Sequence, residues 1–150
     1  QRDTAAIAGT DLGSIPGPEE SEPFDASAVW PGGFIAAAEV RRRLQAPGRA
    51  SYWVRSAVAL LEDEPVGPVA HTARLLDIAN GMAVRHDPRE VAFPNVDLTA
   101  HLVRVPQGEW LGFDTTVTFG PDGLGITSSR LHDEHGPFGT LAQLLTVRPA

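Results

Sequence analysis

One long helix candidate among six strand candidates is the feature that most constrains the fold of this chain of 150 residues. The helix candidate begins at Pro68, because proline is tolerated in the first turn of a helix. We expect it to end near Ala79, where Asn80-Gly81 would supply a left-handed stop. The segment is apolar around most of its circumference, which is typical of a helix enclosed by other elements.

Two strand candidates precede the helix and four follow it. They are residues 34–45 and 50–61 before it, and 96–105, 109–120, 123–133 and 139–148 after it. The first pair is joined by a turn at Ala46-Pro47-Gly48, and segment 34–45 also has helical potential. Turns rich in Pro and Gly separate the last four segments, so we expect them to form a meander. This order predicts an α+β chain with the hotdog fold, in which one curled antiparallel sheet wraps around one central helix.

The N-terminal residues differ from the rest in composition. Residues 1–23 are rich in Gly, Pro, Ser and acidic side chains and show no apolar periodicity, so we interpret them as a linker or N-terminal arm. Residues 24–150 are then a single hotdog domain, long enough to bury a substantial core.

Composition excludes several classes of function. The net charge of −7 argues against a nucleic-acid partner, because phosphate binding needs clustered basic side chains. The chain has no cysteine, so thiolate nucleophiles and cysteine-ligated metals are excluded, and a cytoplasmic location is expected. No apolar run approaches the ~20 residues of a membrane span. The glycine signatures of serine hydrolases, P-loop ATPases and Rossmann dehydrogenases are also missing.

Asp77 is the most unexpected residue of the helix candidate, because it lies between Leu76 and Ile78 in an apolar stretch. An ionised carboxylate is costly to bury without partners, so such a residue is exposed, paired or used in chemistry. We expect Asp77 to occupy a buried or cleft position, because the sheet would enclose the helix.

Two amides complete a candidate site. Strand alternation places Gln143 on the same face as Leu141 and Leu145, where a buried amide needs a partner. Asn95 follows Pro94 at a strand entrance, where irregular backbone can aim a side chain into a cleft. A carboxylate with two amides suits the activation of a water molecule, the carboxylate acting as general base.

A purely structural interpretation of the same residues stays open. Asp77 would pair with Arg74, Gln143 would satisfy a stray backbone group, and Asn95 would form an Asx-turn.

Three other polar clusters indicate less specific chemistry. Residues 132–135 (His-Asp-Glu-His) resemble metal ligands, but they lie at a predicted turn and zinc would need a further ligand from elsewhere. His101 and Asp97 are either an acid–base pair or part of a polar sheet face. Arg41, Arg42 and Arg43 alternate faces of a strand, so they would not converge on a phosphate. We expect neither a metal nor a cofactor.

Taken together, these segments resemble the C-terminal hotdog of the double-hotdog acyl-CoA thioesterases, of the thioesterase II type. The resemblance covers residues 34–149, and its carrying segments are LLDIANG, FPNVDLTAHLVRVPQGEWLGF, GLGITSSRLHDEHGPFGTLAQ and LLTVRP. It implies an acyl-CoA thioesterase of fatty acid metabolism. It also implies that Asp77, Asn95 and Gln143 orient and activate the attacking water, with Asn95 standing where the best-known members have Thr.

The resemblance also implies a partner. Members of this type carry an N-terminal hotdog before the linker, so we expect a second hotdog from a separate chain or from self-association. The alternative function is a non-catalytic acyl-CoA-binding hotdog, or a structural half whose partner holds the active site. A hydratase of enoyl thioesters would need a His close after Asp77, and the nearest one is His86.

Overall fold

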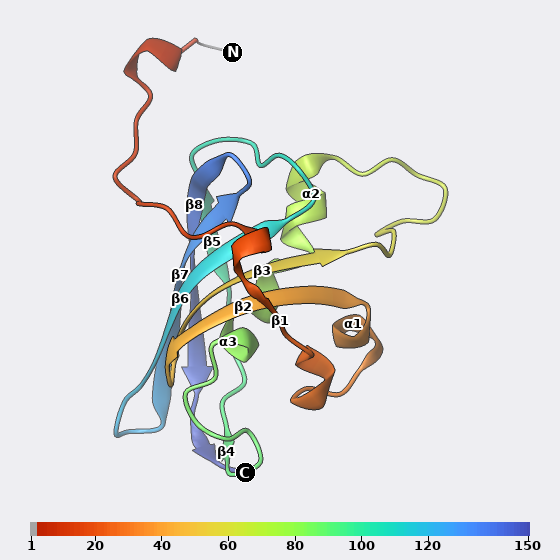
Figure 1. The fold of residues 1–150 in the computed structure, drawn as a ribbon. Helices are drawn as coiled ribbons and strands as arrows, with labels where there is room; N and C mark the ends of the chain where they lie inside the picture. Colours follow the sequence, from red (N-terminus) through yellow and green to blue (C-terminus); the bar gives the residue numbers. More distant parts are fainter. Residues whose placement is uncertain (1–2) are drawn as a thin grey trace.

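The computed structural model describes residues 3–150, so Gln1 and Arg2 of the predicted arm lie outside the described residues. Its main element is a seven-stranded antiparallel sheet with the order β1-β2-β3-β6-β7-β8-β5, which curls around the helical segments α2 and α3 (Figure 1). The strands are β1 (Glu22–Pro23), β2 (Ala38–Ala46), β3 (Arg49–Ser56), β5 (Thr99–Leu102), β6 (Leu111–Phe119), β7 (Leu124–Asp133) and β8 (Gly136–Thr146). A short ribbon pairs β4 (Val91–Ala92) with β9 (Arg148–Pro149). The predicted α+β hotdog architecture is confirmed.

The central helix begins at Pro68 as predicted, but it is built from three consecutive pieces. They are α2 (Pro68–Ala73), the 3₁₀ turn η4 (Leu76–Ile78) and α3 (Ala79–Met82). The predicted stop at Asn80-Gly81 is wrong, because both residues belong to α3 and Gly81 does not adopt a positive φ. Gly81 instead allows a close approach: a Cβ there would lie 3.1 Å from Nε1 of Trp30, which donates to the Gly81 carbonyl at 2.8 Å.

The predicted hairpin before the helix is confirmed for β2 and β3. Residues Gly33–Ala36 form the short helix α1, in keeping with their helical potential, and residues 57–61 leave the sheet. The turn depends on Gly48, whose φ is 75°. A Cβ at Gly48 would lie 2.7 Å from the carbonyl oxygen of Val117.

The four strands after the helix do not form one meander. Strands β6, β7 and β8 follow each other as predicted, but β5 pairs with β8 at the edge of the sheet. Two contacts explain this placement. Gly139 of β8 gives the β5 backbone room, since a Cβ there would lie 2.4 Å from the His101 carbonyl oxygen. Arg104, just after β5, binds Asp133 and the Gly136 carbonyl at the β7–β8 turn.

The core lies between the inner face of the sheet and the central helix. Helix residues Leu75, Ile78 and Met82 are buried there. The large apolar side chains that the sheet contributes include Tyr52, Phe113, Val117, Leu131, Phe138, Leu141 and Leu145. Tyr52 and Phe113 stack with ring centroids 4.9 Å apart. Enclosure by the sheet explains why the helix sequence is apolar on most sides.

Part of the predicted arm contacts the outer face of the sheet. Side chains of three sheet residues reach backbone carbonyls of residues 12–16: Trp53 donates to Pro16 at 2.7 Å, Arg130 donates to Leu12 at 2.9 Å, and His132 lies 3.3 Å from the carbonyl of Gly13. The chain before this contact, which includes the 3₁₀ turn η1 (Ala5–Ile7), extends away from the domain (Figure 1). Further 3₁₀ turns are η2 (Pro18–Glu20) and η3 (Ala26–Ala28). The boundary at residue 23 stays a prediction.

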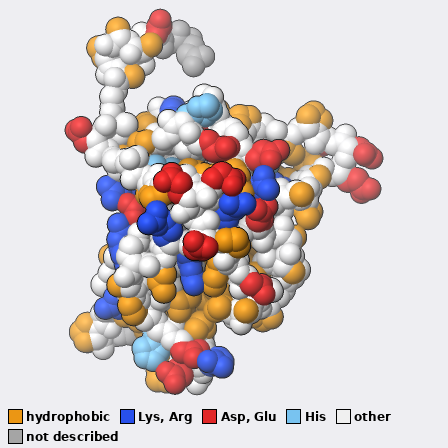
Figure 2. All heavy atoms as spheres, viewed as in Figure 1, with side chains coloured by type: hydrophobic (Ala, Val, Ile, Leu, Met, Phe, Trp, Pro, Cys, Tyr) orange, Lys and Arg blue, Asp and Glu red, His pale blue; other side chains and the backbone are white. Residues whose placement is uncertain are grey.

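The three consecutive arginines of β2 diverge as predicted. Arg41 pairs with Glu19 at 3.1 Å, Arg42 lies over the Phe24 ring, and Arg43 is exposed. On the face shown in Figure 2, arginines and acidic side chains intermingle and form no patch of one sign. Among residues 3–150, no helix is long and apolar enough to cross a lipid bilayer.

Candidate functional site

The three predicted site residues meet beside the middle piece of the central helix. Asp77 lies in η4, Asn95 lies in the segment before β5, and Gln143 lies in β8. The Asn95 amide donates to Oδ1 of Asp77 at 2.7 Å. The Gln143 amide lies 3.5 Å from the same oxygen and 3.4 Å from the Asp77 carbonyl. The fold therefore brings together residues from three separate elements around one carboxylate.

Asp77 is exposed in this chain, so the expectation of a buried position is wrong. The reason is the 3₁₀ turn: its neighbours Leu76 and Ile78 both pack into the core, at 7% and 5% exposure, while Asp77 points outward between them. The suggested pairing of Asp77 with Arg74 is also wrong. The Arg74 guanidinium donates to the carbonyls of Ser56 and Val58 instead.

Gln143 is aimed by strand alternation, as predicted. It is 1% exposed and lies between buried Leu141 and Leu145 on the inner face of β8. Its amide nitrogen points toward Asp77, whereas Oε1 has no hydrogen-bond partner among residues 3–150.

Asn95 is held by backbone bonds on both sides. The Pro94 carbonyl accepts from the Thr146 N–H at 3.1 Å, and the Val96 N–H donates to the Leu144 carbonyl at 2.9 Å. Asn95 itself forms a bridge with Leu145. From the helix side, Asn80 donates to the Phe93 carbonyl at 3.2 Å. Sequence reasoning missed this contribution of Asn80 because it assigned the residue to a helix stop.

Among residues 3–150, only neutral donors bind the Asp77 carboxylate. Both Asn95 and Gln143 approach Oδ1, and within the described part of the chain no hydrogen bond reaches Oδ2. A carboxylate that no cation neutralises keeps an oxygen that can accept a proton. This arrangement suits a general base with two amides that orient a water or a carbonyl group.

Asp133 and His132, in the cluster at residues 132–135, bind other groups of the protein and do not present free ligands to a metal. Asp133 is buried and accepts from Arg104 at 2.6 Å through both oxygens, and from the N–H groups of Gln107 and His135. His132 is buried against two backbone carbonyls. No group of three or more metal-ligating side chains occurs in residues 3–150.

His101 and Asp97 have different surroundings. Asp97 accepts the Leu144 N–H at 2.7 Å, so its carboxylate supports β8. His101 is exposed on the outer face of the sheet, where it lines a pocket of about 400 Å³.

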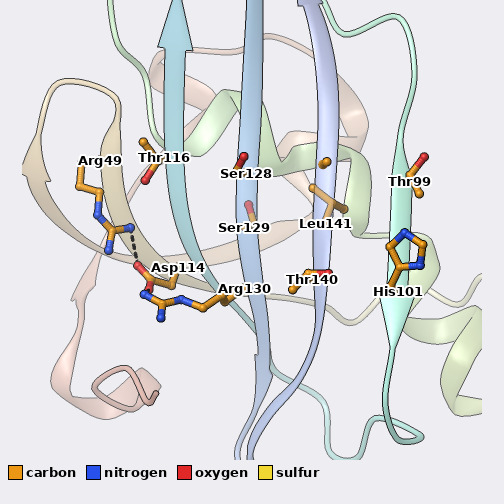
Figure 3. A pocket seen from close by; sticks show the side chains of 11 residues that line it. Arg49, Thr99, His101, Asp114, Thr116, Ser128, Ser129, Arg130, Thr140 and Leu141 are labelled. Atoms are coloured by element: carbon orange, nitrogen blue, oxygen red, sulfur yellow. Dashed lines mark hydrogen bonds and ion pairs between the residues drawn. The ribbon is translucent and has the colours of Figure 1, made fainter. Parts of the chain in front are cut away.

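That pocket contains a second polar cluster, which sequence reasoning missed. Figure 3 shows Asp114 between Arg49 and Arg130, on the face of the sheet away from the helix, with Ser128 and Thr140 beside them. Burial alone would raise the pKa of Asp114, but the two guanidiniums outweigh it and hold this pKa below its usual value. The strand register could have revealed this cluster, because pairing β6 with β7 places Asp114 directly opposite Arg130. Arg49 and Arg130 both pair with the Asp114 carboxylate, so this cluster is an ion-pair network.

Comparisons with solved structures establish the fold. An acyl-CoA thioesterase II of Mycobacterium marinum is 19% identical, with a TM-score of 0.65, over 96% of this chain and 58% of its own. A conserved hot dog protein of Alicyclobacillus acidocaldarius is 17% identical, with a TM-score of 0.67, over 99% and 58%. A candidate thioesterase II of Thermobifida fusca YX is 21% identical, with a TM-score of 0.67, over 94% and 55%. The chain thus spans little more than half the length of these proteins.

Sequence comparison establishes the family. A search among curated proteins found no match. Residues 10–147 match the acyl-CoA thioesterase C-terminal domain, so nearly the whole chain is covered. The hotdog topology agrees with this match. The chain belongs to the family of acyl-CoA thioesterase C-terminal domains.

Proposed function

We propose that this protein hydrolyses acyl-CoA thioesters to the free acid and CoA by direct attack of an activated water. The observation that carries the proposal is the convergence of Asn95 and Gln143 on one oxygen of an Asp77 carboxylate that no cation among residues 3–150 neutralises. Family membership supports thioester hydrolysis in general.

In the proposed reaction, Asp77 is the general base. Its free Oδ2 takes a proton from a water molecule while the water oxygen bonds to the thioester carbonyl carbon. The C–S bond then breaks, the sulfur leaves with the electron pair, and the proton held by Asp77 passes to it to give the CoA thiol. The reaction forms no covalent enzyme intermediate. A positioned general base typically contributes about 10²- to 10⁴-fold in rate.

The two amides have distinct proposed roles. Asn95 donates to Oδ1 and so fixes the rotamer of Asp77 with Oδ2 turned toward the substrate. Gln143 is buried, and its amide nitrogen anchors the same oxygen and helps to hold the water. Thr at position 95 would offer one hydroxyl donor where Asn offers an amide donor, so the substitution preserves the function of the position.

We further propose that a second hotdog domain, in another chain or in a second copy of this one, completes the acyl-binding site. The site lies beside β5, an edge strand of the sheet. Exposed apolar side chains gather around this strand: Val96 at 58%, Leu102 at 38%, Val103 at 73% and Val105 at 55% exposure. Apolar surface of this kind is typical of an interface. A cytoplasmic role in fatty acid metabolism belongs to the same proposal and rests on the family alone.

The test is thiol release from a short, a medium and a long acyl-CoA, measured together with the mass in solution. The variants are Asp77→Asn and the control Asp122→Asn, which alters an exposed carboxylate at the β6–β7 turn. Release that is lost in Asp77→Asn and kept in Asp122→Asn supports the proposal. Equal release by all three proteins removes Asp77 from the mechanism. Binding of acyl-CoA without release would instead favour a non-catalytic binding module.

A further inference from the structure

A row of buried hydroxyl groups crosses the inner face of the sheet beside the helix. The Tyr52 hydroxyl donates to the Ala79 carbonyl at 3.0 Å and lies 3.0 Å from Oγ1 of Thr115. The hydroxyls of Thr115 and Ser129 are 2.7 Å apart. Because the Ala79 carbonyl accepts at one end, each of the three hydroxyls has an acceptor: the carbonyl itself or the next hydroxyl of the row.

Thr127 extends the same face of β7 toward the Asp77 site, two residues before Ser129. Its side chain is fully buried, and within the described chain its hydroxyl has no hydrogen-bond partner. The residue directly opposite on β8 is Gln143. Gln143 is also buried, and its Oε1 is likewise without a partner among residues 3–150. A buried donor and a buried acceptor, each unpaired, therefore face each other across neighbouring strands.

We propose that Thr127 is a positioning residue for the hydrolysis: its hydroxyl donates to Oε1 of Gln143, directly or through one bridging water, and so fixes the Gln143 amide toward Asp77. This inference rests on the proposed function. Side chains directly opposite in an antiparallel pair have Cβ atoms about 4.5–5.5 Å apart, which is within reach of a hydroxyl and a glutamine amide. A water in this position would have polar partners on both sides.

The orientation of the Gln143 amide explains why a donor at Thr127 matters. The amide nitrogen lies near two oxygens of Asp77, its carbonyl and Oδ1. A flipped amide would place Oε1 against these acceptors and turn the donor into the sheet. The two Asp77 oxygens only accept and so require the amide nitrogen on their side, and the Thr127 hydroxyl can then donate to Oε1 on the other side and hold that orientation.

The test compares Thr127→Val, which removes the hydroxyl at nearly constant volume, with Thr127→Ser, which keeps it. We expect Thr127→Val to lower kcat about 10-fold with KM within twofold of wild type, and Thr127→Ser to restore kcat to within threefold. The matched control is Ser129→Ala, which removes a hydroxyl two residues away on the same face and leaves kcat within twofold. In a Gln143→Ala background, Thr127→Val is expected to have no further effect on kcat, because it acts through that amide.

A readout that is independent of activity separates this inference from the proposed function. In ¹⁵N-labelled protein, the side-chain NH₂ signals of Gln143, assigned by their loss in Gln143→Ala, should shift in Thr127→Val and stay in place in Thr127→Ser. If wild type releases no thiol but these signals respond, the proposed function fails while the Thr127–Gln143 contact holds. Unchanged signals, unchanged kcat in Thr127→Val, or an equal loss of kcat with and without Gln143 would each overturn the positioning role.

Discussion

A carboxylate lies near each end of β5, and the two carboxylates have opposite kinds of binding partner. At the helix end, exposed Asp77 is bound by the neutral amides of Asn95 and Gln143. At the other end, Asp133 has a side-chain exposure of 1% and is bound through both oxygens by Arg104, with two backbone N–H groups in addition. The two carboxylates differ both in exposure and in the charge of their partners: Asp133 is buried with a cation and stabilises the fold, whereas Asp77 is exposed with neutral partners, which suits the proposed base. A neighbouring cation stabilises the charged form of a carboxylate and opposes its protonation. A carboxylate that is bound by neutral amides lacks that cation and is better suited to accept a proton.

The pKa of Asp133 follows from this arrangement. Burial alone would raise it, but the Arg104 guanidinium and the N–H groups of Gln107 and His135 outweigh burial and hold the pKa below its ordinary value of 3.8. A lowered pKa in the folded state means that the charged form stabilises the fold. This stabilisation is present above about pH 4 and is lost as the pH falls through the lower folded value.

The strongest way to break the comparison is to neutralise Asp77. Asp77→Asn should lower kcat by about 10³-fold, because it removes the proposed base, while the free energy of unfolding changes by less than about 0.5 kcal/mol because the side chain is exposed. Thiol-release kinetics and urea denaturation measure the two effects. A variant that loses activity only because it unfolds would contradict the assignment.

The second test addresses the other end of the strand. Arg104→Ala should lower the free energy of unfolding by about 3 kcal/mol, because it leaves the buried Asp133 charge without its cation. The substitution affects the stability of the fold and does not touch the Asp77 site, so kcat of the folded fraction should stay within twofold of wild type. Urea denaturation at pH 7 and pH 3 gives the measurement. The difference between wild type and the variant should shrink at pH 3, and an unchanged difference would show that Asp133 is not the group that titrates.

The third test sharpens the role of the neutral donors. Asn95→Ala should lower kcat about 10-fold, since one donor to Oδ1 of Asp77 is lost, and Asn95→Thr should recover most of that loss because a hydroxyl can donate in its place. Steady-state kinetics on the same acyl-CoA give the comparison. Equal activity of the Ala and Thr variants would mean that donation at position 95 does not matter.

The smallest effect is expected on the outer face. Arg49→Ala removes one of the two guanidiniums bound to Asp114, but its side chain is 37% exposed and Arg130 remains in place. Because Arg130 still neutralises the buried Asp114 carboxylate and solvent screens the Arg49 side chain, the free energy of unfolding should fall by about 1 kcal/mol or less. A loss of several kcal/mol in denaturation would show that the two arginines are not redundant.

Local patterns in the sequence predicted most of the elements. The turn chemistry around Gly48 and the alternation of β8 predicted the hairpin and the inward direction of Gln143. Strand order was less predictable, because the position of β5 depends on contacts that are distant in sequence. The room left by Gly139 and the ion pair of Arg104 with Asp133 have no signature in a local pattern.

The candidate site was predictable as a set of residues and only partly as a geometry. The sequence pattern indicated one polar residue in need of a partner on the helix, one at a strand entrance and one on a strand face. In the structure these three residues are partners of one another. The exposure of Asp77 was missed because periodicity assumes a regular helix, whereas residues 76–78 form a 3₁₀ turn. The buried hydroxyl row was missed because Thr115, Thr127 and Ser129 are ordinary strand residues until their register is known.

The interrupted helix sets a limit for protein engineering. A designer seeking thermal stability would favour a continuous α-helix from Pro68 to Met82, with strong helix formers throughout. In such a helix the Asp77 carbonyl would accept from the N–H four residues later. In this molecule the same carbonyl faces the Gln143 amide at 3.4 Å, and the turn directs the Asp77 side chain outward. Regularising the helix would therefore gain stability at the expense of the arrangement around Asp77, so stabilising substitutions are better sought elsewhere in the domain.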